Sequence, residues 1–302
     1  HAKQYIFGHY PIVDHHLLSR QANDPLDTPA LHAFLQQHPD SAWSAALWYN
    51  LGTIYQQAGQ YTDAANAYRQ ASQQVAQASL QSPDLSRMGD GIYAAELMLH
   101  TRLGHAADVT ALLKDSDKHQ SGVAAAAITQ ATAGAWEMQH SPATALRCGT
   151  GALAALLAPE AATHLDNIPA PATGFSLREL QSLAKAQSLP MRAVESRDAI
   201  PVPSVVHWKS GHYAAIVAKQ GDTYQIKDPV LGQEATMRTS SILRESSGHY
   251  LVMPQWQAGR ELSADEAGRI YGAGYTSTKD TASTSPDDKK DCECDKGGGN
   301  SG

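Results

Sequence analysis

Cysteine is scarce in this sequence, with three residues in 302, and the three are unevenly placed. Cys292 and Cys294 lie together near the end of the chain, whereas Cys148 stands alone. This arrangement excludes the disulfide framework that stabilises many small secreted domains. Long apolar runs are missing as well. The uncharged apolar stretch at residues 152–158 is far too short to cross a bilayer, so we expect no membrane span.

Basic residues are outnumbered by acidic ones. The chain has 23 Lys and Arg against 30 Asp and Glu, a formal net charge of -7. A protein that coats a phosphate backbone would work against this charge, so we expect no nucleic-acid partner. A hydrophobic content of 42% and a mean hydropathy of -0.38 are typical of a soluble folded protein. The length is sufficient for two ordinary domains.

The first residue is His1 and not Met. This start indicates a processed mature form or a piece of a longer chain, from which any signal peptide is already gone. The localisation stays open, and a secreted, periplasmic or cell-surface protein is favoured.

The composition and residue spacing of the sequence change twice. Residues 1–140 place Ala, Leu and Gln at helical spacing and predict an all-α domain. Residues 141–257 predict two helices, one after Cys148 and one at 176–188, followed by short apolar runs separated by Gly and Pro. Residues 258–302 are expected to be a C-terminal extension and largely a flexible linker, because Thr, Ser, Asp, Lys and Gly dominate from about Thr276.

The short apolar runs of the second region predict strands. They lie at residues 191–195, 202–208, 212–218, 223–227 and 249–253. Helices followed by a mostly antiparallel sheet indicate an α+β fold.

One repeat signature stands out in the helical region. Its spacing is that of a tetratricopeptide repeat, in which small residues let two helices approach and aromatic residues fill the groove between them. The signature predicts helices at about 42–58 and 62–80, and its residues are Trp48, Leu51, Gly52, Tyr55, Gly59, Tyr61, Ala64, Tyr68 and Ala71. A degenerate second copy is expected at 94–113, with Gly104 in its turn. We expect this tetratricopeptide-like domain to pack on the α+β domain, either as a brace or as a docking surface for a protein partner.

The lone cysteine has two interpretations. Cys148 comes at or near the start of a predicted helix, where unpaired N–H groups and the helix dipole favour the thiolate over the thiol. That position suits a reactive nucleophile. The alternative is a buried structural cysteine, which is the more common state of an isolated one.

A histidine and an aspartate downstream favour the reactive interpretation. His212 opens one predicted strand and Asp228 closes its hairpin partner, so the two are expected to lie side by side in an antiparallel pair. Cys, His and Asp in this order form a papain-like catalytic set. The thiolate attacks, the imidazole moves the proton, and the carboxylate orients the imidazole.

These residues resemble a known family. The sequence resembles the double-glycine leader peptidases, papain-like domains best known from bacterial, bacteriocin-exporting ABC transporters. The resemblance covers residues 148 to about 254 and rests on Cys148-Gly149-x-Gly151-Ala152-Leu153, the helix 176–188, Pro203-x-Val205-x-His207-Trp208, Gly211-His212-Tyr213 and Asp228-Pro229-x-x-Gly232. It implies a cysteine peptidase with Cys148, His212 and Asp228 as catalytic residues, and a peptide or protein substrate cleaved after small residues such as paired glycines. We expect no cofactor.

Two features depart from the family pattern. The family places a Gln a few residues before the Cys, where its amide binds the oxyanion. This sequence has Pro142 and Ala143 there, and the nearest candidate for the oxyanion is Gln139. No transporter segment follows the domain in this sequence, so we do not expect this chain by itself to be a coupled exporter.

The leading interpretation is therefore a papain-like peptidase domain preceded by a tetratricopeptide-like domain. The same triad could also run transamidation. The alternative from another class is a catalytically weak or inactive peptide-binding module, which the missing Gln favours, and the chain could be an accessory region of a larger secreted protein. An activated thiolate would be alkylated much faster at Cys148 than at Cys292 and Cys294, and more slowly after His212→Ala.

Other residues have plainer explanations. His249 follows a glycine as His212 does, but no Asp-Pro turn comes after it, and His207 is expected to be a hydrogen-bonded core histidine. The pair His15 and His16, with His9 and Asp14 nearby, has no second ligand cluster at metal-site spacing. Cys292 and Cys294 could hold a soft metal or bridge to another chain, but their flexible acidic tail disfavours both, so we expect no metal. The glycine run 297–299 raises the hypothesis of self-processing in the tail.

Overall fold

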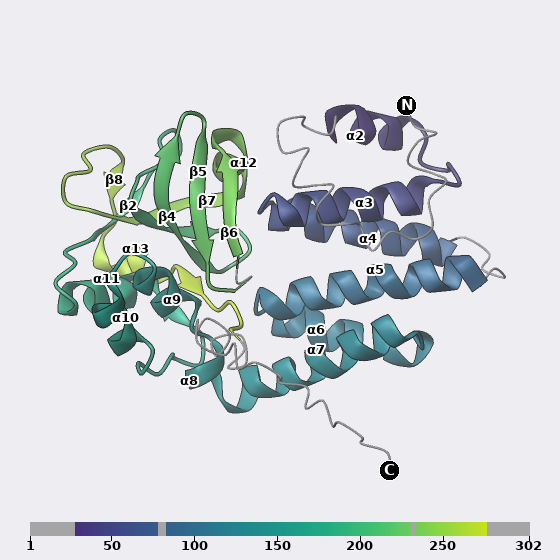
Figure 1. Ribbon diagram of the computed structural model, residues 1–302, viewed down its shortest axis with the longest axis horizontal. Helices are drawn as coiled ribbons and strands as arrows, with labels where there is room; N and C mark the ends of the chain where they lie inside the picture. Colours follow the sequence, from purple (N-terminus) through teal and green to yellow (C-terminus); the bar gives the residue numbers. More distant parts are fainter. Residues whose placement is uncertain (1–27, 78–82, 231–232, 277–302) are drawn as a thin grey trace, which may run out of the picture.

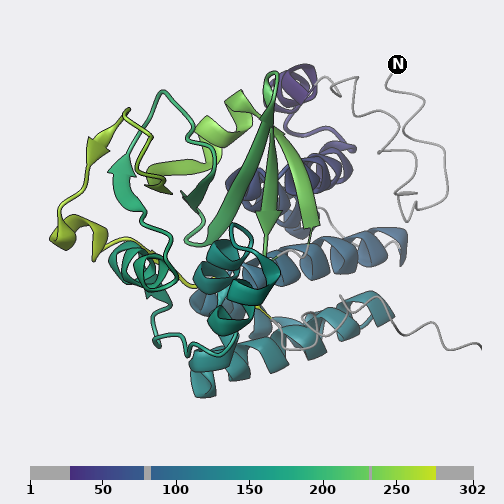
Figure 2. The same cartoon turned by 60° about the vertical axis from the view of Figure 1, so that its left-hand side comes forward.

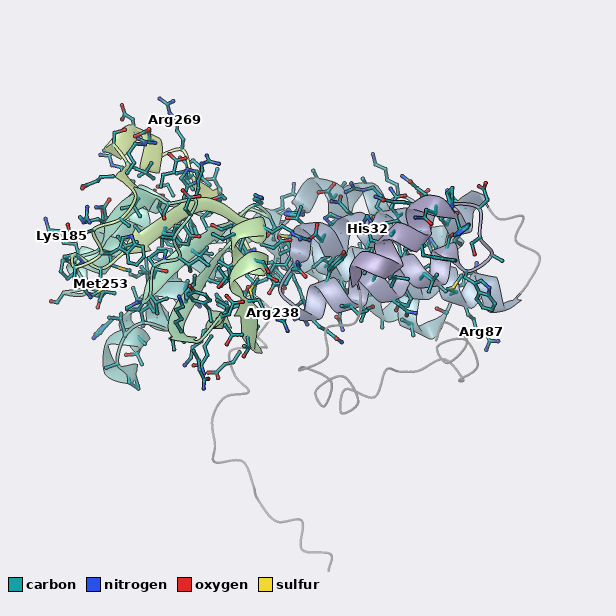
Figure 3. The ribbon with its side chains drawn as sticks, turned by 90° about the horizontal axis from the view of Figure 1, so that it is seen from above. His32, Arg87, Lys185, Arg238, Met253 and Arg269 are labelled. Carbon is teal, nitrogen blue, oxygen red and sulfur yellow. The ribbon has the colours of Figure 1, made fainter. Side chains whose placement is uncertain are left out.

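The computed structural model describes residues 28–77, 83–230 and 233–276. Figure 1 shows a helical half, residues 28–140, beside a sheet half, residues 141–276. Viewed from above in Figure 3, Arg238 lies where the sheet half meets the helices, while Lys185 and Met253 lie at its far end. Helices followed by an antiparallel sheet confirm the predicted α+β class.

The helical half is built from antiparallel neighbours packed in chain order (Figure 1). Its elements are α2 (Thr28–Gln37), α3 (Ser44–Gln57), α4 (Tyr61–Gln77), α5 (Pro83–Arg102), α6 (Ala106–Leu113), the 3-10 turn η2 (Ser116–Lys118) and α7 (Gly122–His140). No helix in the described part of the chain is long and apolar enough to cross a membrane.

The helical hairpin predicted from the repeat signature is present as α3 and α4. Gly52 of α3 lies directly against the ring of Tyr68 in α4, and a Cβ at Gly52 would come within 2.5 Å of that ring. Gly59 closes the hairpin with a φ of 73°, a left-handed conformation that favours glycine. The second predicted hairpin is α5 and α6, joined at Gly104. Its helices have 20 and 8 residues, so it departs from a regular repeat.

The main sheet has the strand order β6-β5-β4-β3-β7-β2-β8, with antiparallel neighbours throughout. Its strands are β2 (Arg192–Glu195), β3 (Ser204–Trp208), β4 (Tyr213–Gln220), β5 (Thr223–Asp228), β6 (Gln233–Arg238), β7 (Ser246–Val252) and β8 (Arg260–Glu261). Each of the predicted runs overlaps a strand. The edge strand β6 was not predicted, because its sequence is mostly polar and Met237 is the one buried residue among residues 234–238.

Successive residues of the strands enter two different cores. Val205 packs in the core shared with α9 (Cys148–Ala154) and α11 (Leu177–Ala186), whereas its neighbour Val206 packs on the opposite face with α12 (Thr239–Glu245). This is the period of two expected of a strand buried on both faces. Around the first core also lie α8 (Pro142–Ala145), α10 (Pro159–Leu165) and α13 (Ala264–Ala267).

Residues 258–276 are folded, although the sequence placed an extension from 258. β8 pairs with β2, and β9 (Tyr271–Gly272) pairs with β1 (Phe175–Ser176). Between them, α13 begins with a capping box formed by Ser263 and Glu266. The segment, yellow in Figures 1 and 2, runs from the outer edge of the sheet back to the junction of the two halves.

The two halves are joined by buried polar contacts. The backbone N–H groups of Thr62 and Asp63, in the first turn of α4, donate to the carboxylate of Glu245 at 3.1 and 3.4 Å. Glu245 is fully buried, and this burial raises the pKa of its carboxyl group. A buried carboxylate without hydrogen-bond partners would destabilise the folded state. These two hydrogen bonds therefore fix how the helices sit on the sheet half.

Candidate functional site

The sequence around Cys148 explains how the thiol is positioned. Cys148 is the first residue of α9 and has no exposed surface. Gly149 and Gly151 let α9 close on its neighbours, since a Cβ at these positions would come within 2.7 Å of Leu180 and Pro229 respectively. The Cys-Gly-x-Gly motif is therefore a packing requirement that seats the cysteine against α11 and the turn after β5.

The environment of the thiol differs from the sequence-based expectation. Burial raises the pKa of Cys148 to about 12, in spite of backbone N–H groups of Tyr213, Gly274 and Gly149 that favour the thiolate. The negative charge of Asp228 raises the pKa further. The expectation of a thiolate stabilised by the helix start is therefore wrong for this conformation, because desolvation outweighs the hydrogen bonds.

His212 and Asp228 lie side by side, as the hairpin of β4 and β5 predicts. Nε2 of His212 is 2.9 Å from Oδ2 of Asp228, and both side chains are buried. Oδ1 of Asp228 accepts a hydrogen bond from the backbone N–H of Val230 at 2.9 Å. The hydrogen bond from Val230 thus fixes the carboxylate of Asp228, and this carboxylate orients the imidazole.

A serine side chain lies within hydrogen-bond distance of the other ring nitrogen of His212. Oγ of Ser210 lies 3.1 Å from Nδ1 of His212, and the carbonyl oxygen of Ser210 accepts from Nε2 of His105 at 2.8 Å. His105 belongs to the turn between α5 and α6. The helical half therefore supports the loop that holds His212.

Tyr61 also reaches the site from the helical half. It is the first residue of α4, and its hydroxyl group donates to Oδ2 of Asp228 at 3.3 Å. Its ring centroid is 5.4 Å from that of His212. Burial and the charge of Asp228 raise the pKa of Tyr61 well above its ordinary value, so it stays a neutral donor. The sequence marked Tyr61 only as a repeat position, and nothing in its local pattern points to Asp228.

The C-terminal segment lies over the cysteine. The backbone N–H of Gly274 donates to Sγ of Cys148 at 3.2 Å, and that of Ala273 donates to the carbonyl oxygen of Gly211 at 2.9 Å. A Cβ at Gly274 would lie 2.9 Å from the Cβ of His212 and 3.1 Å from that of Cys148. Gly274 is therefore flanked by the two side chains predicted to be the nucleophile and the base.

The other predicted residues make contacts of their own or have no contact described with the triad. Gln139 is in the last turn of α7 with an exposed side chain, whereas Cys148 is fully buried, and its role at the oxyanion stays a prediction. His207 is hydrogen-bonded at both ring nitrogens, to Ser247 and to the carbonyl oxygen of Tyr271. His249 pairs across the sheet with His207. The hypotheses for His9, Asp14, His15, His16, Cys292, Cys294 and residues 297–299 fall outside the described residues.

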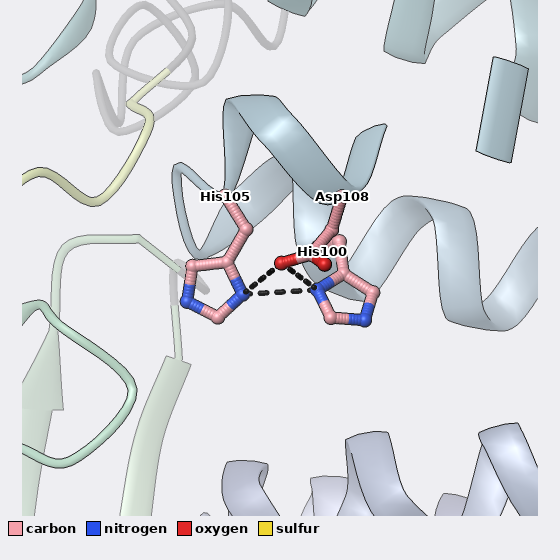
Figure 4. Close-up of side chains that lie close together, drawn as sticks. All are labelled: His100, His105 and Asp108. Carbon is pink, nitrogen blue, oxygen red and sulfur yellow. Dashed lines mark hydrogen bonds and ion pairs between the residues drawn. The ribbon is translucent and has the colours of Figure 1, made fainter. Parts of the chain in front are cut away.

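One cluster in the described part of the chain has the residue types of a metal site. The ligand atoms of His100, His105 and Asp108 lie within 4.8 Å of one another (Figure 4). Nε2 of His105 donates to Ser210, so its Nδ1 is free to accept from Nδ1 of His100 at 2.9 Å. A hydrogen bond between the two imidazoles accounts for their short distance without an ion.

These histidines should make the fold sensitive to acid. Burial lowers the pKa of His100 and of His207 to about 4. Between pH 4 and about 6.5 the unfolded chain binds more protons at these positions, so the free energy of unfolding should fall as the pH falls through this window, by up to about 1.4 kcal/mol per pH unit and group. Urea unfolding at pH 4.5 and 7 measures this. His100→Asn should reduce the loss, and an unchanged pH dependence would contradict the prediction.

The comparisons with known proteins agree with the resemblance drawn from the sequence. The sequence of residues 148–257 matches the peptidase C39 family. No curated protein and no solved structure matches the chain. The matched region begins at Cys148 and contains His212 and Asp228. Residues 148–257 are therefore a cysteine peptidase domain of the peptidase C39 family.

Proposed function

We propose that Cys148, His212 and Asp228 are the catalytic triad of this peptidase domain. The observation that carries the proposal is the buried 2.9 Å contact between Nε2 of His212 and Oδ2 of Asp228. His212 and the cysteine at the start of α9 both lie against Gly274. Asp228 engages Nε2, so Nδ1 is the ring atom left to exchange a proton with Cys148. In the conformation described, Oγ of Ser210 lies 3.1 Å from Nδ1, so this contact must give way when Nδ1 receives the thiol proton.

The reaction follows from these positions. Nδ1 of His212 takes the proton of Cys148, and Sγ attacks the carbonyl carbon of the scissile bond. The C–N bond then breaks, His212 returns the proton to the leaving amine, and a thioester remains on Cys148. Water activated by His212 hydrolyses the thioester and releases the new carboxylate. Asp228 keeps the imidazole in the orientation that each proton transfer needs.

The space beside Cys148 supports a preference for small residues. A Cβ at Gly272 would come within 2.4 Å of the ring of Tyr213, and one at Gly274 within 2.5 Å of Val230. A peptide that follows the same path can place only glycine, or at most a very small residue, at these two positions. The proposed substrate is a peptide with small residues around the scissile bond.

Peptide cleavage by the full chain tests the triad. The variant Gly274→Val keeps the site open, because the added side chain cannot fit between Val230, His212 and Cys148. This variant should cleave peptides with Gly-Gly or Gly-Ala junctions, as read by mass spectrometry, and adding Cys148→Ala should lower the rate at least about 100-fold. Adding Cys292→Ala instead is the matched control. Equal rates in the Cys148→Ala and Cys292→Ala chains would contradict the triad.

A second candidate function is peptide binding without cleavage. It is supported by the raised pKa of Cys148, which leaves the thiol protonated in the closed conformation. In that case the Gly274→Val chain would bind the same peptides with equal affinity whether residue 148 is Cys or Ala, and would leave them intact. Fluorescence anisotropy of labelled peptides measures this affinity.

A further inference from the structure

The C-terminal segment enters the site as an extended peptide would. Gly272 and Tyr271 of β9 pair with Phe175 and Ser176 of β1 in antiparallel register. The next residue, Ala273, donates its N–H to the carbonyl oxygen of Gly211, directly before His212. Main-chain pairing of this kind is how clefts hold extended peptides.

We propose that this chain is its own substrate, and that Cys148 cleaves the peptide bond between Ala273 and Gly274. The inference rests on the proposed triad and goes beyond it, because it assigns a substrate within the same molecule. The self-processing hypothesis drawn from the sequence concerned residues 297–299. The structure instead places residues 272–274 at the cysteine.

The segment is held firmly upstream of this bond. Leu262 and Ala267 are buried in the core that contains Cys148, and Ile270 packs against the same core. The carbonyl oxygen of Ile270 accepts from the hydroxyl group of Tyr213 at 2.8 Å, and that of Tyr271 accepts from His207 at 2.8 Å. The path of the chain is therefore fixed before it reaches the thiol.

The helical half holds the segment downstream. The N–H of Tyr275 donates to the carbonyl oxygen of Arg102 at 2.9 Å, and its hydroxyl group donates to Glu137 at 2.7 Å. The carbonyl oxygen of Ala273 lies against Gly104, where a Cβ would come within 1.8 Å of it. Contacts on both sides of one peptide bond keep that bond next to Cys148, which is the positioning that favours reaction.

The geometry selects one peptide bond. The nitrogen of Gly274 is 3.2 Å from Sγ of Cys148. The carbonyl carbon of Ala273 is one C–N bond, about 1.33 Å, from that nitrogen, which places it within about 4.5 Å of Sγ. Because the N–H of Gly274 points at Sγ, the sulfur lies near the plane of this peptide bond. Attack therefore requires the peptide to turn its face toward Sγ as well as to approach by about 1 Å.

The step balances with water as the other reactant. His212 accepts the thiol proton, and Sγ forms a bond to the carbonyl carbon of Ala273. The bond from this carbon to the nitrogen of Gly274 breaks, and His212 gives the proton to the amine of Gly274. Water then hydrolyses the thioester, leaving a carboxylate on Ala273 and restoring the thiol of Cys148.

Mass spectrometry of the purified full chain tests the proposal. Wild-type protein should yield a fragment that begins at Gly274 and a fragment that ends at Ala273. Cys148→Ala should stay at full length, and His212→Ala should be cleaved at least about 100-fold more slowly. Cleavage confined to residues 297–299, or equal cleavage in Cys148→Ala, would overturn the assignment.

A pair of glycine variants separates this proposal from the triad. Gly274→Val should abolish self-cleavage yet cleave added small-residue peptides. Gly122→Val, which adds the same side chain where nothing lies within 4 Å, should self-cleave like wild type. Peptide cleavage by Gly274→Val together with an intact wild-type chain would overturn self-cleavage and leave the triad standing. Loss of both activities in every variant and in wild type would overturn both.

Discussion

In a chain kept uncleaved by His212→Ala, the Cys148 thiol should react with iodoacetamide about a thousandfold more slowly than a free cysteine at neutral pH. The thiolate is the reactive form, and burial raises the pKa from 9.0 to about 12, which lowers the thiolate fraction by that factor. Access is also blocked, since Cys148 has no exposed surface and Gly274 lies against its side chain. The rate is measured by mass spectrometry of the peptide that contains Cys148.

The matched control opens the site without touching the cysteine. Adding Gly274→Val to His212→Ala should speed alkylation at least about tenfold, because the displaced segment no longer excludes solvent. Adding Gly122→Val instead should leave the rate unchanged. An alkylation rate in the His212→Ala chain within tenfold of free cysteine would contradict the closed conformation. Slow alkylation after His212→Ala agrees with the expectation from the sequence, whereas the raised pKa of Cys148 opposes the fast alkylation expected of the wild-type chain.

The raised pKa of Cys148 shows what could not be predicted from the sequence. The position of Cys148 at the start of α9 was predicted, because the Cys-Gly-x-Gly stretch runs directly into an apolar helical pattern. The direction of its pKa shift was not predicted correctly. The residue that covers the thiol, Gly274, is 126 residues away in the sequence. A helix start can leave a local signal in the sequence, whereas burial by a distant segment leaves none.

The same distinction applies to the rest of the site. His212 and Asp228 could be paired from the sequence because a short hairpin brings its first and last residues together, and β4 and β5 form that hairpin. Tyr61 and His105 could not be assigned, because they reach the site through packing of the helical half on the sheet half. The helical half therefore contacts both Asp228 and the loop before His212.

Replacing Asp228 by Ala should lower the rate of self-cleavage by about 10³-fold or more, by comparison with the aspartate of serine peptidase triads. Its carboxylate accepts hydrogen bonds from His212 and Tyr61 on one oxygen and from Val230 on the other. The substitution leaves these buried donors without that acceptor, so the imidazole loses its fixed orientation. The rate is followed by quantifying the fragment that begins at Gly274.

A graded series separates orientation of His212 from loss of folding. Asp228→Asn keeps an oxygen acceptor but faces one buried donor with an NH₂ group, so its rate should fall between those of Asp228→Ala and wild type. Tyr61→Phe removes one neutral hydrogen bond and keeps the ring against His212, so it should slow cleavage by about tenfold at most. Asp117→Asn, an exposed position, should cleave like wild type. Wild-type rates in Asp228→Ala, with an unchanged melting temperature, would show that His212 is oriented without Asp228.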